Sequence, residues 1–157
     1  MAAPRTYEER RSHALKLLKA PEADAWVATA SADGVTHMVP LSIGWTDGTV
    51  VLVTESRSVT AKNLRPSTKV RLGLGGTRDV VMVVAELVGA HALADAPEPL
   101  VSAFAQQSGW DPRGDGDADK FRLYELRPVT IQAWREANEI VGRTLMTAGA
   151  WVGEPTA

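Results

Sequence analysis

Side chains that could bind an anion gather in the twelve residues from Thr54 to Arg65 (TESRSVTAKNLR). Four of these residues carry a hydroxyl group and three carry a positive charge, and both groups donate hydrogen bonds to phosphate oxygens. The segment falls between an expected strand end and an expected helix start, where free backbone amides and a positive partial charge add to the same effect. The pattern predicts a phosphate cradle. A well-capped surface helix with solvated charges would use the same residue types, and the spacing leaves that interpretation open.

No other motif in the sequence points to a catalytic or metal site. The chain has no cysteine, which excludes disulfides, thiolate catalysis and cysteine-bound metals. Gly73–Arg78 begins like a dinucleotide-binding loop, but Arg78 stands where the third glycine is required and no helix is expected to follow. His13, His37 and His91 lie on different expected elements, so no metal site is predicted. His37 is expected to line a pocket or to serve the structure.

Composition limits the class of protein. The 157 residues suit one domain, and 45% apolar with 23% charged residues is the balance of a soluble globular chain. A net charge of -2 gives no electrostatic reason to expect a nucleic acid or an anionic membrane as partner. The longest strongly apolar run, Val80 to Ala85, is far shorter than the roughly 20 residues of a membrane span. The N-terminus lacks the pattern of a secretory signal, so a cytoplasmic location is expected.

The hydrophobic pattern predicts a mainly β fold with flanking α-helices. Thr6 and Glu9 form a capping box that begins the first helix. Asp33-Gly34 and Asp47-Gly48 are typical of tight hairpin turns, so the strands around them are expected to be antiparallel. The expected strands are 25–31, 35–45, 49–54, 69–74, 79–93 and 121–135, with further helices at about 58–65 and 97–107. Six strands of this length are expected to close into a barrel that hides their edges.

Serine and proline residues indicate where these elements begin and end. Ser56 or Ser58 can cap the short helix, and Pro66 ends it. Pro40 and Pro128 lack a backbone donor, so each is expected at a bulge or an unpaired edge. One domain is expected, with the N-terminal helix in 1–24, the barrel in 25–135 and a tail in 136–157. The tail is too apolar for a free coil and is expected to pack on another surface, a partner subunit being one candidate.

Three segments, taken in order, resemble a known family. They are the hairpin 28–41 with its Asp-Gly turn and proline-containing second strand, the frame of Thr54, Ser58 and Leu64, and the long strand 79–93 after a turn. Their order is similar to that of the pyridoxamine 5'-phosphate oxidase-like split barrels, which include flavin mononucleotide (FMN) oxidases and deazaflavin-dependent reductases. The resemblance covers about 25–90 and, more weakly, 121–135. It implies a six-stranded antiparallel split β-barrel of Greek-key type, and a homodimer with cofactor sites between the subunits.

The resemblance implies which residues hold the phosphate. In the family an Arg-Lys pair directly after the serine usually meets the phosphate, and here those positions hold Val59 and Thr60. Thr54, Ser58 and Thr60 are implied as phosphate contacts. Lys62 and Asn63 are the expected substitutes for the missing pair, because Lys62 lies one helical turn beyond Ser58.

The resemblance also implies contacts to the ring system. Val39, Pro40 and Leu41 are placed against the ring, where backbone groups beside the proline could bond its pyrimidine edge. The second subunit is expected to complete each pocket, with candidates at a turn and near the last strand: Arg78, Asp79, Trp110, Trp134 and Arg135. For each tryptophan, a place in the core or at an interface is the competing interpretation.

These features together predict a flavin-type oxidoreductase that transfers hydride to or from a small organic substrate. The implied cofactor is FMN or, alternatively, the deazaflavin coenzyme F420, since both carry a tricyclic ring and a phosphate beside a polyol chain. The ring itself performs the hydride transfer, so no catalytic side chain is predicted. The alternative is a non-catalytic barrel that holds a flavin, haem or another ligand as carrier or sensor, and the missing Arg-Lys pair motivates it.

Overall fold

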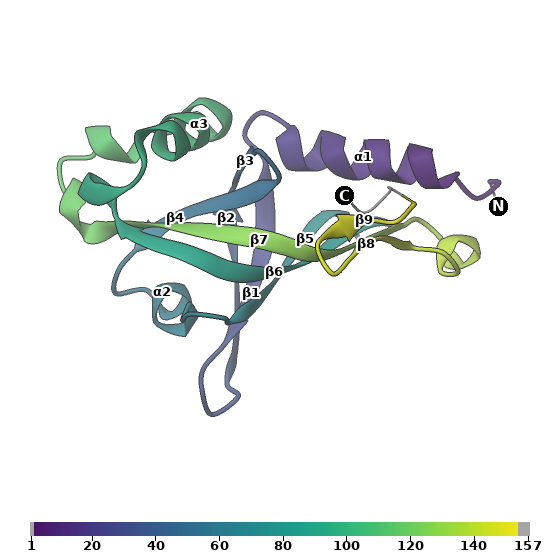
Figure 1. The fold of residues 1–157 in the computed structure, drawn as a ribbon, viewed down its shortest axis with the longest axis horizontal. Helices are drawn as coiled ribbons and strands as arrows, with labels where there is room; N and C mark the ends of the chain where they lie inside the picture. Colours follow the sequence, from purple (N-terminus) through teal and green to yellow (C-terminus); the bar gives the residue numbers. More distant parts are fainter. Residues whose placement is uncertain (1, 154–157) are drawn as a thin grey trace.

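The computed structural model describes residues 2–153, which form a curled antiparallel sheet with three α-helices around it (Figure 1). The helices are α1 (Tyr7–Lys19), α2 (Val59–Asn63) and α3 (Glu98–Ser108). The strands of the described residues are β1 (Asp24–Ala30), β2 (Thr36–Ser42), β3 (Gly44–Thr46), β4 (Thr49–Glu55), β5 (Lys69–Gly76), β6 (Asp79–Ala92), β7 (Phe121–Trp134), β8 (Thr144–Thr147) and β9 (Ala150–Trp151). Their order is β2-β1-β5-β6-β7-β4-β3, with β8 on β7 and β9 on β8. The fold is the mainly β, split-barrel type that the sequence predicts.

The strand count differs from the prediction, because the described part of the chain has nine strands instead of six. The expected strand 35–45 is two strands, β2 and β3, since the chain breaks its ladder at Ile43. The buried Ile43 donates its N–H to the carbonyl of Ala23 at 3.0 Å instead. The tail supplies the other new strands, β8 and β9, which extend the sheet from β7 within the same chain.

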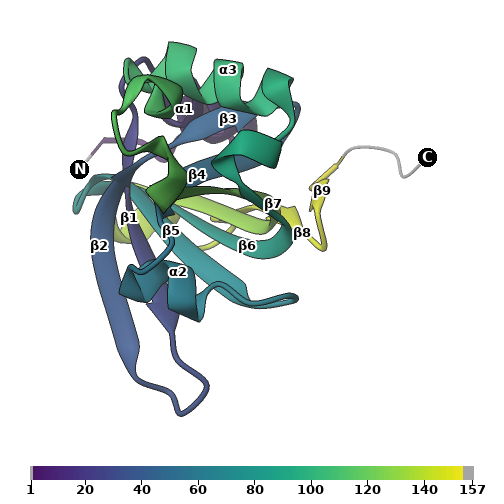
Figure 2. The ribbon, with the colours of Figure 1, turned by 90° about the vertical axis from the view of Figure 1, so that its left-hand side faces the viewer.

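The turns and bulges form near the residues that suit them. Asp47 and Gly48 have φ angles of 48° and 76°, as a two-residue turn with both central residues at positive φ requires. Pro40 lies in β2, an edge strand of the sheet, where a residue without a donor is tolerated. The β6–β7 ladder shifts register beside Pro128, which confirms the predicted bulge. The β1–β2 hairpin projects beyond the rest of the sheet in both views (Figures 1 and 2).

Two apolar clusters lie on opposite faces of the sheet. Val27, Leu72 and Leu126 belong to the larger cluster inside the curled sheet. The smaller cluster includes Val51 and Phe104, and α3 covers it from outside (Figure 2). β4 contributes to both clusters, so its residues 50–53 are buried without alternation, as expected for a strand covered on both faces.

Polar contacts fix the helices on the sheet. The capping box of Thr6 and Glu9 is formed at the start of α1, as predicted. The Gln107 amide at the end of α3 donates to the carbonyls of Leu18 and Ala20 and accepts from the Trp45 N–H at 2.7 Å. It thereby joins α3, the end of α1 and β3. None of the described helices is both long and apolar enough to cross a membrane.

Candidate functional site

Two of the predicted phosphate ligands lie together where β4 ends and α2 begins. Ser58 is the N-cap of α2, and its Oγ accepts the Ala61 N–H at 3.0 Å. Thr54, the last inward-facing residue of β4, donates its hydroxyl to the same Ser58 Oγ at 3.3 Å. α2 has only five residues, so few aligned peptide dipoles stand behind this end. An anion here would therefore depend on hydroxyl groups and cationic side chains.

The other α2 candidates point in different directions. Thr60 and Asn63 are 2% and 4% exposed, and Asn63 Nδ2 donates to Thr29 Oγ1 on β1 at 3.1 Å. These two side chains hold α2 on the sheet, and a ligand would reach them only after α2 moved. Their phosphate contact stays a prediction. Lys62 is exposed, and no carboxylate within residues 2–153 pairs with it.

A hollow of about 540 Å³ lies beneath α2, between this helix and the strands β6 and β7. β5 begins opposite Glu86, so the next residues of β6 have no strand partner on that side and form one wall. The exposed lining is about as polar as it is apolar, with Ser56, Arg122 and Tyr124 as its polar side chains. The lining residues are Ser56, Ala61, Leu64, Pro66, Leu87, Val88, Gly89, Ala90, Arg122 and Tyr124.

Arg122 is the residue of this hollow that sequence reasoning missed. It pairs with Thr54 across the β4–β7 ladder, and cross-strand partners carry their side chains on the same face of a sheet. The half-buried guanidinium has no carboxylate partner among the described residues. Burial raises the pKa of Tyr124, and the charge of Arg122 and its hydrogen bond to the Tyr124 hydroxyl oppose that rise. The neighbouring acid, Glu55, already pairs with Lys120 at 3.7 Å, so this end of the barrel keeps positive charge available.

The residues predicted to face the ring system divide between the two faces of β2. Val39 and Leu41 are half-buried opposite Val27 and Ala25, whose side chains belong to the inner core. Pro40 is exposed on the outer face. Two of the three residues can therefore line one surface, and the third can act there only through its backbone.

Arg78 and Trp134 form a second group, far from α2 in the same chain. Arg78 follows β5, whereas α2 leads into the start of β5, and eight strand residues span about 26 Å. The Arg78 side chain is 85% exposed and lies 3.6 Å from Glu136. Trp134 is half-buried, with the Arg143 guanidinium 5.0 Å from its ring centre. Neither residue can reach a ligand held beside Ser58 of its own chain.

The three histidines lie apart, as their sequence positions suggest. His13 on α1 lies 3.4 Å from Asp79, and His91 on β6 lies 2.7 Å from Glu125. His37 is half-buried on β2. Within residues 2–153, no group of three or more His, Asp and Glu side chains is arranged to hold a metal ion.

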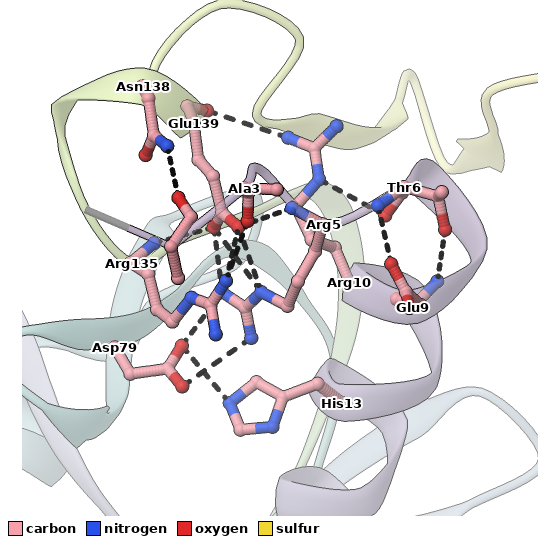
Figure 3. A network of polar contacts seen from close by, with 11 residues as sticks. Ala3, Arg5, Thr6, Glu9, Arg10, His13, Asp79, Arg135, Asn138 and Glu139 are labelled. Carbon is pink, nitrogen blue, oxygen red and sulfur yellow. Dashed lines mark hydrogen bonds and ion pairs between the residues drawn. The ribbon is translucent and has the colours of Figure 1, made fainter.

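A buried ion network fixes the turn that carries Arg78 (Figure 3). The fully buried Glu139 carboxylate accepts the Arg5 backbone N–H at 2.7 Å, the Arg5 Nη2 at 2.8 Å and the Arg135 backbone N–H at 2.8 Å. Arg5 continues to Asp79 at 2.9 Å. These bonds, those from Arg5 above all, lower the pKa of Glu139 from 4.5 to about 2. Asp79 and Arg135, two sequence candidates for the pocket, are therefore engaged within their own chain.

An exposed apolar surface covers part of the outer face of the sheet. Trp26 and Met38 are 54% and 61% exposed, although both are large apolar residues. They border a hollow of about 430 Å³ whose other walls include Gly73, Val80 and Met82. Trp134 pairs with Val80 and lies at the margin of this surface. The remaining tryptophan candidate, Trp110, instead packs edge-on against Phe104 and Phe121.

Comparisons with known proteins identify the fold. No family model and no curated protein sequence matches the chain. Among solved structures, an F420 reductase aligns with a TM-score of 0.58 and 14% identity, over 82% of this chain and 98% of its own. A pyridoxamine 5'-phosphate oxidase-related, FMN-binding protein from Nostoc punctiforme aligns with a TM-score of 0.55 and 17% identity, over 85% and 86%. A haem-binding protein from Mycobacterium smegmatis aligns with a TM-score of 0.59 and 18% identity, over 95% and 60%. The chain has the pyridoxamine 5'-phosphate oxidase-like split-barrel fold.

Proposed function

From this fold, we propose that the protein is a flavin-type oxidoreductase that binds FMN or a deazaflavin through its phosphate end and acts on a small organic substrate. The observation that carries the proposal is the hydroxyl pair of Thr54 and Ser58, joined at 3.3 Å beside the α2 hollow. Proteins with this fold include an F420 reductase and an FMN-binding protein, which supports a flavin or deazaflavin as the class of ligand.

The residues at the α2 end suit a phosphate ester. Ser58 Oγ accepts from Thr54 and from the Ala61 N–H, so its own proton is free to donate to a phosphate oxygen, and Lys62 has no competing acid among the described residues. The adjoining hollow of about 540 Å³ falls within the usual range for a small-molecule site. Its lining is about half polar and half apolar, which suits a flat ring with polar edges.

The chain's own residues would bind, orient and shield the cofactor. Thr54 and Ser58 would hold the phosphate end, and backbone groups of Val39, Pro40 and Leu41 on the edge strand β2 would bond the ring. A bound flavin would supply the hydride transfer, and for that reason the site needs no paired acid and base of its own. Water would be excluded by the apolar walls contributed by Leu64, Leu87 and their neighbours.

A homodimer is part of the proposal. Arg78 follows the far end of β5, a strand about 26 Å long whose start follows α2, and Trp134 lies beside that far end opposite Val80, so these two residues would complete the pocket of another copy. The exposed apolar surface around Trp26 and Met38 is the kind of surface that association buries. It lies beside Trp134, so a second copy seated there would bring that tryptophan to the interface.

The second candidate is a non-catalytic barrel that holds haem or another ligand. It is favoured by Val59 and the buried Thr60 where the family usually has an Arg-Lys pair. A haem-binding protein among the structures with this fold gives the same support.

An absorption spectrum of the purified protein separates the two candidates. A flavin or deazaflavin band that bleaches on reduction, or saturable binding of FMN or F420 by the colourless protein, supports a flavin-type cofactor, and turnover of the bound cofactor with a small organic substrate supports the oxidoreductase. A haem band, without binding of either cofactor, supports the carrier. In FMN titrations we expect Lys62→Ala to weaken affinity at least about tenfold, as loss of one charge-assisted contact should. The matched control is Lys16→Ala on α1, another exposed lysine, which should leave affinity unchanged.

A further inference from the structure

We propose that Arg122 is a second cation, beside Lys62, that binds the cofactor's phosphate where this chain lacks the Arg-Lys pair. The inference rests on the proposed function and names the residue that gives the site its charge selectivity. Arg122 lies on β7, far from α2 in the sequence, so the spacing of the Thr54–Arg65 segment does not predict its role.

The position of Arg122 supports this role. Arg122 and Thr54 are partners across the β4–β7 ladder, so their side chains leave the sheet on the same face. Thr54 in turn donates to Ser58, and Ser56 lines the same hollow as Arg122. One guanidinium and three hydroxyl groups thus converge from β4, β7 and the start of α2.

The charge balance supports it as well. A half-buried guanidinium is costly unless an anion or a set of acceptors compensates it. Arg122 has a hydrogen bond to the neutral Tyr124 hydroxyl but no carboxylate partner within the described residues, whereas the exposed Arg113 and the half-buried Arg5 each have acidic partners. The planar guanidinium can give two parallel hydrogen bonds to a phosphate, which an ammonium group cannot.

Tyr124 adds a neutral donor to the same wall. Its side chain lies two residues from Arg122 on the same face of β7 and lines the hollow. A tyrosine hydroxyl is protonated at neutral pH, so the Tyr124 oxygen can accept a hydrogen bond from Arg122 while its proton donates to an anion. A phosphate bound at Arg122 would therefore meet donors on two sides.

The test compares two ligands that differ only in the phosphate: FMN and riboflavin. Both are titrated by flavin fluorescence against the full-length wild type, Arg122→Gln, Arg122→Lys and the control Arg127→Gln. Arg127 lies on the same strand and is exposed, with no acidic partner in the described residues. We expect Arg122→Gln to weaken FMN binding at least about tenfold and to change riboflavin binding less than about twofold. Arg122→Lys should fall between, and Arg127→Gln should match the wild type.

Inorganic phosphate provides the second readout. It should compete with FMN but not with riboflavin in the wild type, and the competition should weaken at least about tenfold in Arg122→Gln. If Arg122→Gln does not fold by circular dichroism, Arg122→Lys and the phosphate competition decide the question. Equal losses for FMN and riboflavin, or an unchanged FMN affinity, would overturn the role of Arg122 and leave the flavin assignment standing.

A wild type that binds neither FMN nor coenzyme F420 overturns the proposed function instead. In that case a titration with inorganic phosphate, followed by NMR at the Arg122 side-chain Nε–H resonance, tests the anion site independently of any flavin. A saturable shift absent at Arg127 would support an anion site, and no shift would overturn it.

Discussion

Replacement of Glu139 by Gln tests the buried network that joins the N-terminal segment to the end of the barrel. The carboxylate is fully buried and accepts bonds from Arg5 and from the Arg135 backbone (Figure 3). Its pKa falls from 4.5 to about 2, and a fall of this size corresponds to about 3 kcal/mol of stabilisation at neutral pH. A Gln side chain has the shape of Glu but no charge, and its NH₂ group would lie against the N–H donors of Arg5 and Arg135. We expect a loss of about 2–3 kcal/mol, or a Tm lower by roughly 4–12 °C.

The direction of the pKa shift determines how the stabilisation from Glu139 changes with pH. The folded pKa lies below the unfolded one, so the stabilisation is complete above about pH 5 and is lost as pH falls towards 2. At pH 3 only about 1 kcal/mol of it should remain. The difference in unfolding free energy between wild type and Glu139→Gln should therefore shrink by about 2 kcal/mol from pH 7 to pH 3, in urea denaturation at each pH.

The neighbouring Glu136 supplies the control. It lies 3.6 Å from the exposed Arg78, and an exposed pair of this kind contributes little. Glu136→Gln should unfold like the wild type at both pH values. If Glu139→Gln and Glu136→Gln had the same stability at pH 7, or if the Glu139→Gln difference did not change with pH, the charge of Glu139 would not be what holds the two ends together.

Two further predictions concern the β5–β6 turn and the outer face of the sheet. Gly75 has φ of +81°, and a Cβ there would lie 2.3 Å from the Asp79 carbonyl oxygen, so Gly75→Ala should lower the unfolding free energy by at least about 2 kcal/mol. A Cβ on Gly76 meets nothing within 4 Å, so Gly76→Ala should be nearly neutral in the same urea titration. On the outer face, Trp26→Glu should convert a dimer to monomers in light scattering without a change in the circular dichroism spectrum, because the side chain is 54% exposed. A wild type that is already monomeric would contradict the proposed dimer.

The sequence was sufficient for elements whose signals are local. Asp47-Gly48 carries its own turn chemistry, Thr6 and Glu9 satisfy each other across one helical turn, and Ser58 is separated from its capping partner by three residues. The bulge beside Pro128 could be predicted because proline has no backbone N–H to donate, whatever its neighbours are. The division of the second strand at Ile43 had no such signal, since it depends on a hydrogen bond to Ala23, twenty residues earlier.

The candidate site shows the same limit more clearly, because its parts come together only through strand order. Thr54 and Ser58 were predicted as neighbours since four residues separate them. Arg122 was missed because nothing in the sequence reveals that β7 pairs with β4, and only that pairing sets it opposite Thr54. The same sheet order separates Arg78 from α2 by the length of β5, so Arg78 and the Thr54–Ser58 pair lie towards opposite ends of that strand. A pocket that uses residues from both ends of β5 requires two chains, so cofactor binding should depend on dimerisation. A variant that cannot dimerise should also lose the contributions of Arg78 and Trp134 to cofactor affinity.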